Sequence, residues 1–187
     1  MQTEILFAGF GGQGILFAGQ VLAYAAMDAG REVTWIPSYG PEMRGGTANC
    51  TVIISDELIG SATVRHPKAV LAFNLPSFDK YEPEVQPGGV LVVNKSLVDR
   101  GFSRTDLSCV LIPANEVAEE LGDKRLTNMV MLGAMVAKLP ILPLELLEKT
   151  LQAHLPQKHK HLLPANFAAL RRGFEFALQE PVALLSA

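Results

Sequence analysis

Cysteine is scarce in this chain of 187 residues, and the two cysteines that are present, Cys50 and Cys109, lie far apart. No Cys-x-x-Cys pair exists, so the sequence excludes a zinc ribbon or an iron–sulfur cluster built from this chain alone. Each cysteine lies within an apolar run, which predicts buried, reduced thiols rather than a disulfide.

Charge is also limited, since 19% of the residues are charged and 16 basic against 19 acidic residues give a net charge of −3. This balance lacks the basic excess that is typical of a nucleic-acid-binding protein. The hydrophobic fraction of 49% excludes a disordered chain. The mean hydropathy of +0.23 indicates that another chain covers part of the surface.

Long apolar runs are absent as well, because Gln20, Lys138 or Pro140 interrupts the most apolar segments before they could span a bilayer. The first residues lack the basic region of a secretory leader and lead directly into a strand pattern. We therefore expect a cytoplasmic protein that binds neither membrane nor nucleic acid.

Apolar runs and glycine breaks predict a three-layer α/β sandwich with one mainly parallel, Rossmann-like sheet and a helical C-terminal third. The expected strands cover residues 5–8, 32–37, 47–55, 69–73, 90–93 and 109–113, with a short return strand at 58–60. The expected helices cover residues 15–29, 78–85, 116–121, 128–139, 143–154 and 166–179. The first strand, the first helix and the second strand form a βαβ unit. No linker is visible, which predicts a single domain over residues 1–187.

The segment between the first strand and the first helix carries Gly9, Gly11 and Gly14 in a Gly-x-Gly-x-x-Gly pattern. Glycines let a backbone approach a ligand closely, and the free N–H groups at a helix start favour an anion. Dinucleotide-binding proteins share the pattern, but they also need an acidic residue near the end of the second strand, where this chain has Pro37 and Ser38. The glycines could also serve only for tight packing of the strand on the helix.

A second glycine-rich segment, Ser38-Tyr-Gly-Pro-Glu-Met-Arg-Gly-Gly46, follows the second strand and cannot form regular structure. Other motifs accompany it in a fixed order: Gly9-Phe-Gly-Gly-Gln-Gly-Ile15, Thr47-Ala-Asn-Cys-Thr-Val52, and Asn128 ahead of Leu132-Gly133-Ala134. Together they resemble the gamma subunit of 2-oxoacid:ferredoxin oxidoreductases, over residues 3–180. The 2-oxoglutarate and branched-chain 2-oxoacid types are more similar than the pyruvate types.

The resemblance implies an enzyme that oxidatively decarboxylates a 2-oxoacid with coenzyme A, giving an acyl-CoA, carbon dioxide and reduced ferredoxin. It implies that thiamine diphosphate, magnesium and the iron–sulfur clusters lie on alpha, beta and, in some members, delta subunits, so that this chain holds no cofactor alone. The gamma subunit is then implicated in coenzyme A access and in assembly. The resemblance implies that ferredoxin interacts with the complex as a whole. It does not decide whether the isolated chain forms a homodimer.

The residues agree with a chain that is inactive alone. A thiamine diphosphate site requires a Gly-Asp-Gly segment followed by Asn, which the sequence lacks, and no Ser/His/Asp or Cys/His set is evident. We therefore assign no catalytic residue and no metal ligand. The alternatives are a stand-alone Rossmann-type dinucleotide-binding oxidoreductase and a purely structural assembly module.

The candidate cofactor-binding residues come from the two glycine segments and one later asparagine: Gly9, Gly11, Gly12, Gln13, Gly14, Ser38, Tyr39, Arg44, Gly45, Gly46 and Asn128. Arg44 suits a phosphate or a carboxylate because its guanidinium forms a fixed fork, and an internal pair with Glu42 is the alternative. Gln13 could orient a ligand or cap the helix, and Tyr39 could anchor a partner. Asn128 could contact a ligand or only cap its helix or tie the backbone.

The basic stretch at 158–161, with Arg171 and Arg172 beyond it, is interpreted as a solvated interhelical loop and helix face. Long-range attraction of coenzyme A phosphates is the alternative role.

Overall fold

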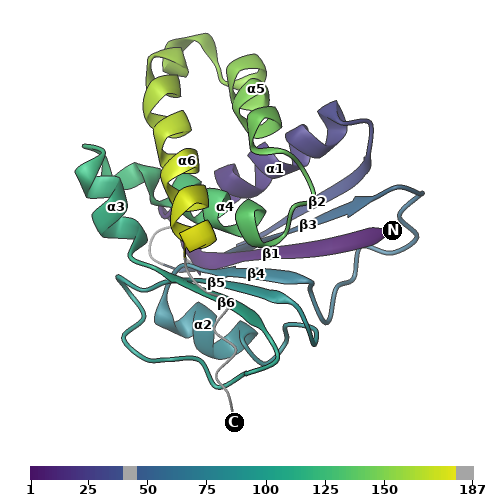
Figure 1. The fold of residues 1–187 in the computed structure, drawn as a ribbon. Helices are drawn as coiled ribbons and strands as arrows, with labels where there is room; N and C mark the ends of the chain where they lie inside the picture. Colours follow the sequence, from purple (N-terminus) through teal and green to yellow (C-terminus); the bar gives the residue numbers. More distant parts are fainter. Residues whose placement is uncertain (40–45, 180–187) are drawn as a thin grey trace.

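The computed structural model describes residues 1–39 and 46–179 (Figure 1). Its strands are β1 (Gln2–Phe10), β2 (Glu32–Tyr39), β3 (Thr47–Ser55), β4 (Ala69–Ala72), β5 (Val90–Asn94) and β6 (Ser108–Ile112). Its α-helices are α1 (Ile15–Asp28), α2 (Leu75–Tyr81), α3 (Ala114–Glu120), α4 (Thr127–Lys138), α5 (Leu144–His154) and α6 (Leu163–Gln179). Two short 3-10 helices, η1 (Lys124–Leu126) and η2 (Gln157–Leu162), precede α4 and α6.

The strands form one mixed sheet in the order β2-β3-β1-β4-β5-β6. β1, β4, β5 and β6 run parallel to one another, whereas β3 runs antiparallel to both β1 and β2. The mainly parallel α/β sheet expected from the sequence is therefore confirmed. Val90–Asn94 is buried along its whole length, as expected for a strand that is covered on both faces.

β3 separates β1 from β2, so the two parallel strands of the predicted βαβ unit are not direct neighbours. The connection from β2 to β3 is short, since only residues 40–46 separate the two strands. A parallel neighbour needs a crossover of about a dozen residues or more, so β3 returns antiparallel. Its register places Thr51 between Leu6 of β1 and Ile36 of β2, in one row across the sheet.

The predicted return strand at 58–60 is wrong, because this stretch forms irregular backbone. Leu58 is 87% exposed, so its side chain has no core to pack against. The second predicted helix also begins earlier than expected, at Leu75, because the Asn74 side chain accepts a hydrogen bond from the Ser77 N–H and caps the helix there.

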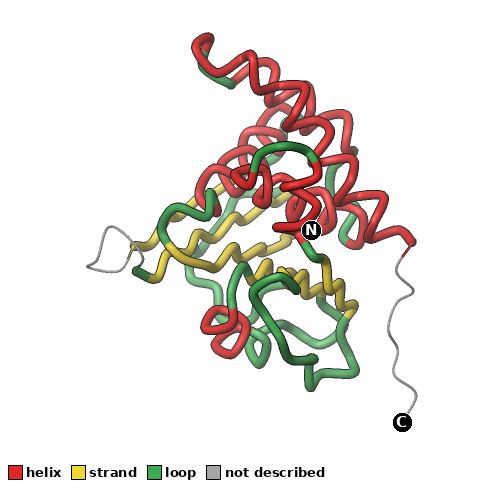
Figure 2. Tube along the Cα trace, turned by 90° about the vertical axis from the view of Figure 1, so that its left-hand side faces the viewer, coloured by secondary structure: helices red, strands yellow, loops and turns green. Residues whose placement is uncertain are grey.

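Helices cover the two faces of the sheet unequally (Figures 1 and 2). α1, α3, α4, α5 and α6 lie on one face, over a core that includes Phe7, Leu71 and Met129. On the other face, α2 lies over β1 and β4 and buries Phe78. The sandwich therefore has three layers, and the described residues place no helix over the second face of β2 and β3.

α4 and α6 approach each other at two glycines. Gly133 of α4 lies against the Leu170 carbonyl of α6, and Gly173 of α6 lies against the Val130 carbonyl of α4. A Cβ atom at either glycine would overlap the facing carbonyl oxygen. The predicted burial of the apolar helix is confirmed, since its residues from Thr127 to Val136 are all buried.

Glu82, which directly follows α2, is a buried carboxylate that fastens the connection between β5 and β6. Its Oε1 accepts hydrogen bonds from the Ser103 N–H at 2.5 Å, the Ser103 hydroxyl at 3.2 Å and the Arg104 N–H at 3.3 Å. Arg104 in turn forms a bidentate pair with Asp106. The long connection is thus tied to the end of α2 through one side chain.

Both cysteine thiols are buried and free, as the sequence predicts. Burial raises the pKa of Cys50 and of Cys109 to about 12 from an ordinary value of 9.0. Because the pKa of each thiol is raised in the folded protein, these thiols ionise more readily in the unfolded chain. Their contribution to the free energy of unfolding is therefore fully present below pH 9 and is lost as the pH rises towards 12.

We therefore expect a thiol reagent at neutral pH to modify the native protein at least about 100-fold more slowly than the unfolded chain. Absorbance of the released chromophore, with and without denaturant, measures both rates. A thiol in the native protein that reacts at the unfolded rate would contradict this prediction.

Candidate functional site

The glycine loop between β1 and α1 turns at Gly12 and Gly14, whose φ angles are 97° and 73°. Backbones in this left-handed region strain any residue that carries a Cβ atom. Gly14 is the N-cap of α1 and supplies no side chain, so the N–H groups of the first helical turn have no partner within the helix. These donors, with the positive end of the helix dipole, suit an anionic group.

The Gln13 side chain holds this loop in place through hydrogen bonds of both its amide oxygen and its amide nitrogen. Oε1 accepts from the Phe10 N–H at 2.7 Å and from Asn74 Nδ2 at 3.1 Å, while Nε2 donates to the Phe73 carbonyl at 3.3 Å. A Cβ atom at Gly9 would overlap this amide, so the first glycine makes room for the Gln13 side chain. Gln13 thus ties the loop to the end of β4 and does not cap α1.

Asn128 ties α4 to the start of α1. Its Nδ2 donates to the Gly14 carbonyl at 3.0 Å, and its Oδ1 accepts from the Met129 N–H at 2.8 Å. The side chain is 5% exposed, and a Cβ atom at Gly14 would overlap its amide. The backbone tie weighed in the sequence analysis is the contact that the structure contains.

The second glycine segment reaches the first through its last residue, since the Gly11 N–H donates to the Gly46 carbonyl at 3.0 Å. Ser38 lies exposed near the end of β2, and Tyr39 ends that strand. The structure thus brings one end of the second segment against the first loop. Arg44 and Gly45, with Glu42, lie outside the described residues.

Two hollows flank the glycine loop. The larger, about 340 Å³, is lined by Gly12, Gly14, Phe17, Arg125, Asn128 and Asn166, among others. The smaller, about 280 Å³, is lined by Gly12, Gln13, Asn115, Lys124, Arg125 and Thr127, among others. Both hollows therefore border the loop at Gly12.

Sequence reasoning missed Arg125, which lines both hollows, and Lys124, which lines the smaller one. The available signal was a basic pair directly ahead of the buried helix of Asn128. Asp123 binds the Arg125 guanidinium at 2.7 Å, and these hydrogen bonds hold the pKa of the Asp123 carboxyl below its usual value. The guanidinium is thereby held at the rim of the site.

The histidines make separate local contacts. His66 lies near Glu84, and His154 near Asp28. Hydrogen bonds from Thr150 and then His154 hold the pKa of the Asp28 carboxyl below its usual value. Within residues 1–39 and 46–179, no group of His, Cys, Asp or Glu side chains is arranged to hold a metal ion.

The basic stretch at 158–161 falls in the short helix η2, where all four residues are exposed and His159 lines the larger hollow. Arg171 and Arg172 pair with Glu148 and Glu120 on the helical side of the molecule. These contacts fit the predicted solvated helix face. No helix of the described part of the chain is long and apolar enough to cross a membrane.

A family model described as pyruvate ferredoxin/flavodoxin oxidoreductase matches residues 4–176. The ketoisovalerate oxidoreductase subunit VorA of Methanothermobacter marburgensis is 44% identical over 73% of this chain, which spans 28% of that relative's length. The 2-oxoglutarate synthase subunit KorC of Methanocaldococcus jannaschii is 35% identical over 95% of both chains. The pyruvate synthase subunit PorC of Thermotoga maritima is 33% identical over 92% of this chain and 93% of PorC.

Solved structures show the same fold. The gamma subunit of a keto/oxoacid ferredoxin oxidoreductase from Geobacter sulfurreducens has a TM-score of 0.82 and 34% identity, covering 95% of this chain and 99% of that one. The 2-oxoglutarate:ferredoxin oxidoreductase from Magnetococcus marinus has a TM-score of 0.86 and 27% identity. This likeness covers 97% of this chain but 32% of that one, whose structure contains 2-oxoglutarate, coenzyme A and succinyl-CoA.

Proposed function

The chain belongs to the pyruvate ferredoxin/flavodoxin oxidoreductase family, and from that premise we propose that it is the gamma subunit of a 2-oxoacid:ferredoxin oxidoreductase. The observation that carries this proposal is the end-to-end match with a gamma subunit of known structure, at 34% identity. The 2-oxoacid is of the 2-oxoglutarate or branched-chain type, a choice supported by the names of KorC and VorA. The enzyme acts in the cytoplasm and passes its electrons to ferredoxin.

Within that complex, this chain binds the phosphate-bearing end of coenzyme A at the glycine loop. The supporting geometry is the helix start at Gly14, the backbone turn at Gly12 and the cations Lys124 and Arg125 beside the hollows. N–H donors and cations are the groups that recognise phosphates. Arg44, from the second glycine segment, adds a guanidinium to the same ligand or to a partner's carboxylate.

Thiamine diphosphate, magnesium and the iron–sulfur clusters belong to the alpha, beta or delta subunits. The residues of this chain do not fit them, because two buried thiols with raised pKa cannot ligate a cluster and no segment matches a thiamine diphosphate site. Its own contribution is to hold coenzyme A by its phosphates and to take part in assembly.

The structure supports a stand-alone dinucleotide-binding enzyme less well than a gamma subunit. In the Rossmann arrangement, the second strand lies beside the first and carries an acidic residue that binds the ribose. Here β3 separates these strands, and Ser38 stands near the end of β2. Among the described residues, none at the end of β2 offers a bound ribose a carboxylate.

The test compares Gly12→Ala with Gly30→Ala in the assembled enzyme. Both glycines have a positive φ, 97° and 74°, and open space where a Cβ would stand, but they lie at opposite ends of α1. Each substitution is expected to cost about 1 kcal/mol of stability from backbone strain. Only Gly12→Ala is expected to raise KM for coenzyme A, by about tenfold, because it disturbs donors that hold the ligand.

Steady-state turnover measures KM, and size-exclusion chromatography measures assembly. Arg44→Ala is expected to raise KM in the same direction as Gly12→Ala. An unchanged KM together with lost assembly would support the purely structural module, and turnover of a 2-oxoacid by the isolated chain would overturn the proposal.

A further inference from the structure

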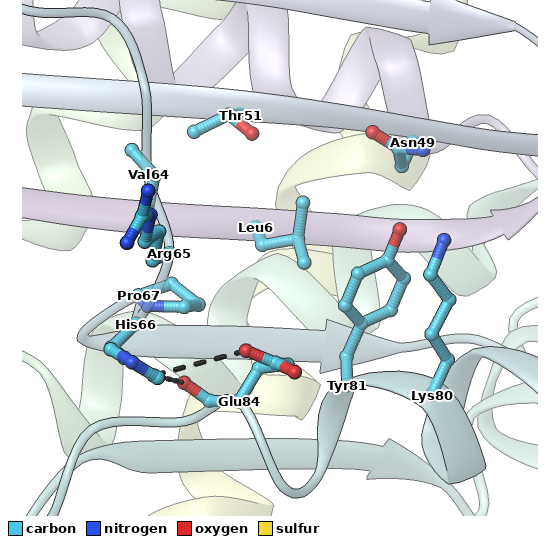
Figure 3. A pocket seen from close by; sticks show the side chains of 10 residues that line it. All are labelled: Leu6, Asn49, Thr51, Val64, Arg65, His66, Pro67, Lys80, Tyr81 and Glu84. Atoms are coloured by element: carbon cyan, nitrogen blue, oxygen red, sulfur yellow. Dashed lines mark hydrogen bonds and ion pairs between the residues drawn. The ribbon is translucent and has the colours of Figure 1, made fainter.

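A groove of about 390 Å³ lies on the less covered face of the sheet, and none of its lining residues belongs to the glycine loop (Figure 3). Leu6 of β1 and Asn49 and Thr51 of β3 contribute its floor. Lys80 and Tyr81 extend side by side from α2 toward Asn49, while Arg65 lies at the other end (Figure 3). The groove therefore extends from the part of the sheet that no described helix covers to the edge of α2.

Several polar side chains of this groove can donate hydrogen bonds that no acceptor among the described residues takes. Among the described residues, Asn49, Thr51, Arg65 and Tyr81 make no side-chain hydrogen bond or ion pair. The Lys80 ammonium lies 4.8 Å from the centre of the Tyr81 ring and likewise has no carboxylate or hydrogen-bond partner in that part of the chain. These side chains can therefore donate hydrogen bonds to a partner that is rich in acceptors.

Arg65 differs from the other arginines that the structure describes. These other arginines each form an ion pair with a carboxylate: Arg31, Arg100, Arg104, Arg125, Arg171 and Arg172. The nearest carboxylate in the groove, Glu84, lies 3.8 Å from the His66 ring instead. The two cations at the ends of the groove thus stand free for a negatively charged occupant.

The occupant is better matched by a polypeptide than by a small anion. Arg65 and Lys80 are exposed, so a small ion bound there would stay in water and gain little. The floor also continues from Leu6 through Thr51 to Ile36, which is 36% exposed, and so adds apolar surface beyond the cations. Apolar surface bordered by charge is typical of a protein interface.

Relatives supply a reason for such an interface. This chain corresponds to 28% of the VorA polypeptide and to 32% of the Magnetococcus marinus chain, so larger parts accompany the same fold there. We propose that the groove docks an acidic segment of a larger subunit of the same enzyme, with its carboxylates on Arg65 and Lys80 and its apolar side chains on Ile36. The inference rests on the proposed gamma-subunit function.

The test mixes the purified chain with its purified larger subunits and measures the Kd by biolayer interferometry. Arg65→Glu with Lys80→Glu is expected to weaken binding by about thirtyfold, and the wild-type Kd is expected to rise with salt. Lys149→Glu with Lys160→Glu is the matched control, since it reverses two exposed lysines on the helical side and is expected to bind like the wild type. Circular dichroism and thermal melting check folding, and Arg65→Ala with Lys80→Ala, expected to weaken binding less, replaces the reversal if that variant unfolds.

Several outcomes would overturn the inference. If the wild type binds and the groove variant binds equally well, this face is not the docking surface, although the proposed function stands. If the wild type does not bind the larger subunits, the proposed function fails as well. A groove variant that keeps its affinity for the larger subunits but loses affinity for inorganic phosphate would show that the groove is a small-anion site. A groove variant that loses only its self-association would show that the groove is a contact between copies of this chain.

Discussion

Gly133→Ala is expected to lower the free energy of unfolding by about 3 kcal/mol, although alanine is ordinarily the better residue in a helix by about 1 kcal/mol. The reason is the close approach of α4 to α6, where the new methyl group would overlap the Leu170 carbonyl. A backbone oxygen cannot turn aside as a flexible side chain can, so one helix must move and open the core. Urea unfolding followed by circular dichroism measures the loss.

Gly173→Ala should behave alike, because its methyl group would overlap the Val130 carbonyl. The double variant should lose less than the sum of the two, since the first substitution already separates the helices. Gly101→Ala serves as the control: it has open space, no positive φ and an expected change within about 0.5 kcal/mol. A Gly133→Ala protein as stable as the wild type would show that the helices are not in this contact.

Glu82→Ala is expected to cost about 3 kcal/mol, because it removes the acceptor for the N–H groups of Ser103 and Arg104. Glu82 is 3% exposed, so water does not readily replace the lost carboxylate. Glu82→Gln keeps an acceptor oxygen and should cost about half as much. Hydrogen exchange of these two amides, together with urea unfolding, provides the measurement.

Glu84→Ala is the matched control for Glu82→Ala, since Glu84 is exposed and lies on the same turn. Its expected change is within about 0.5 kcal/mol. Fast exchange at Ser103 in the Glu82 variant, with wild-type exchange in the control, would locate the effect. Equal stability of the two variants would contradict the structural role of Glu82.

The alternation of strands and helices was predictable because buried parallel strands leave continuous apolar runs, as in Ile5–Ala8 and Val90–Asn94. The position of β3 was harder to predict, since the same apolar pattern suits a neighbour on either side of β1. The short connection at 40–46 excludes a parallel crossover, so it predicts the antiparallel direction of β3 but not its place between β1 and β2. Connection length and apolar pattern must therefore be read together.

At the candidate site, the glycines were predictable because their backbone requirements are local. The role of Gln13 was not, since its partners Phe73 and Asn74 lie far along the chain and meet it only after β4 pairs with β1. Arg125 was missed for a related reason: the basic pair ahead of the helix of Asn128 was visible in the sequence, but its position beside Gly12 depends on the fold. Contacts between distant segments depend on the sheet order, which a single sequence does not state.

The sheet order also leaves β2 at one margin, bonded to β3 alone among the described strands. An unpaired margin of this kind can recruit a strand from a foreign chain and so start aggregation. Pro37, which pairs in register with Cys50, lies in this strand and offers no N–H to an incoming backbone. The proline thus interrupts the backbone template that β2 and β3 would otherwise present, and it lowers the tendency of this margin to pair with another chain.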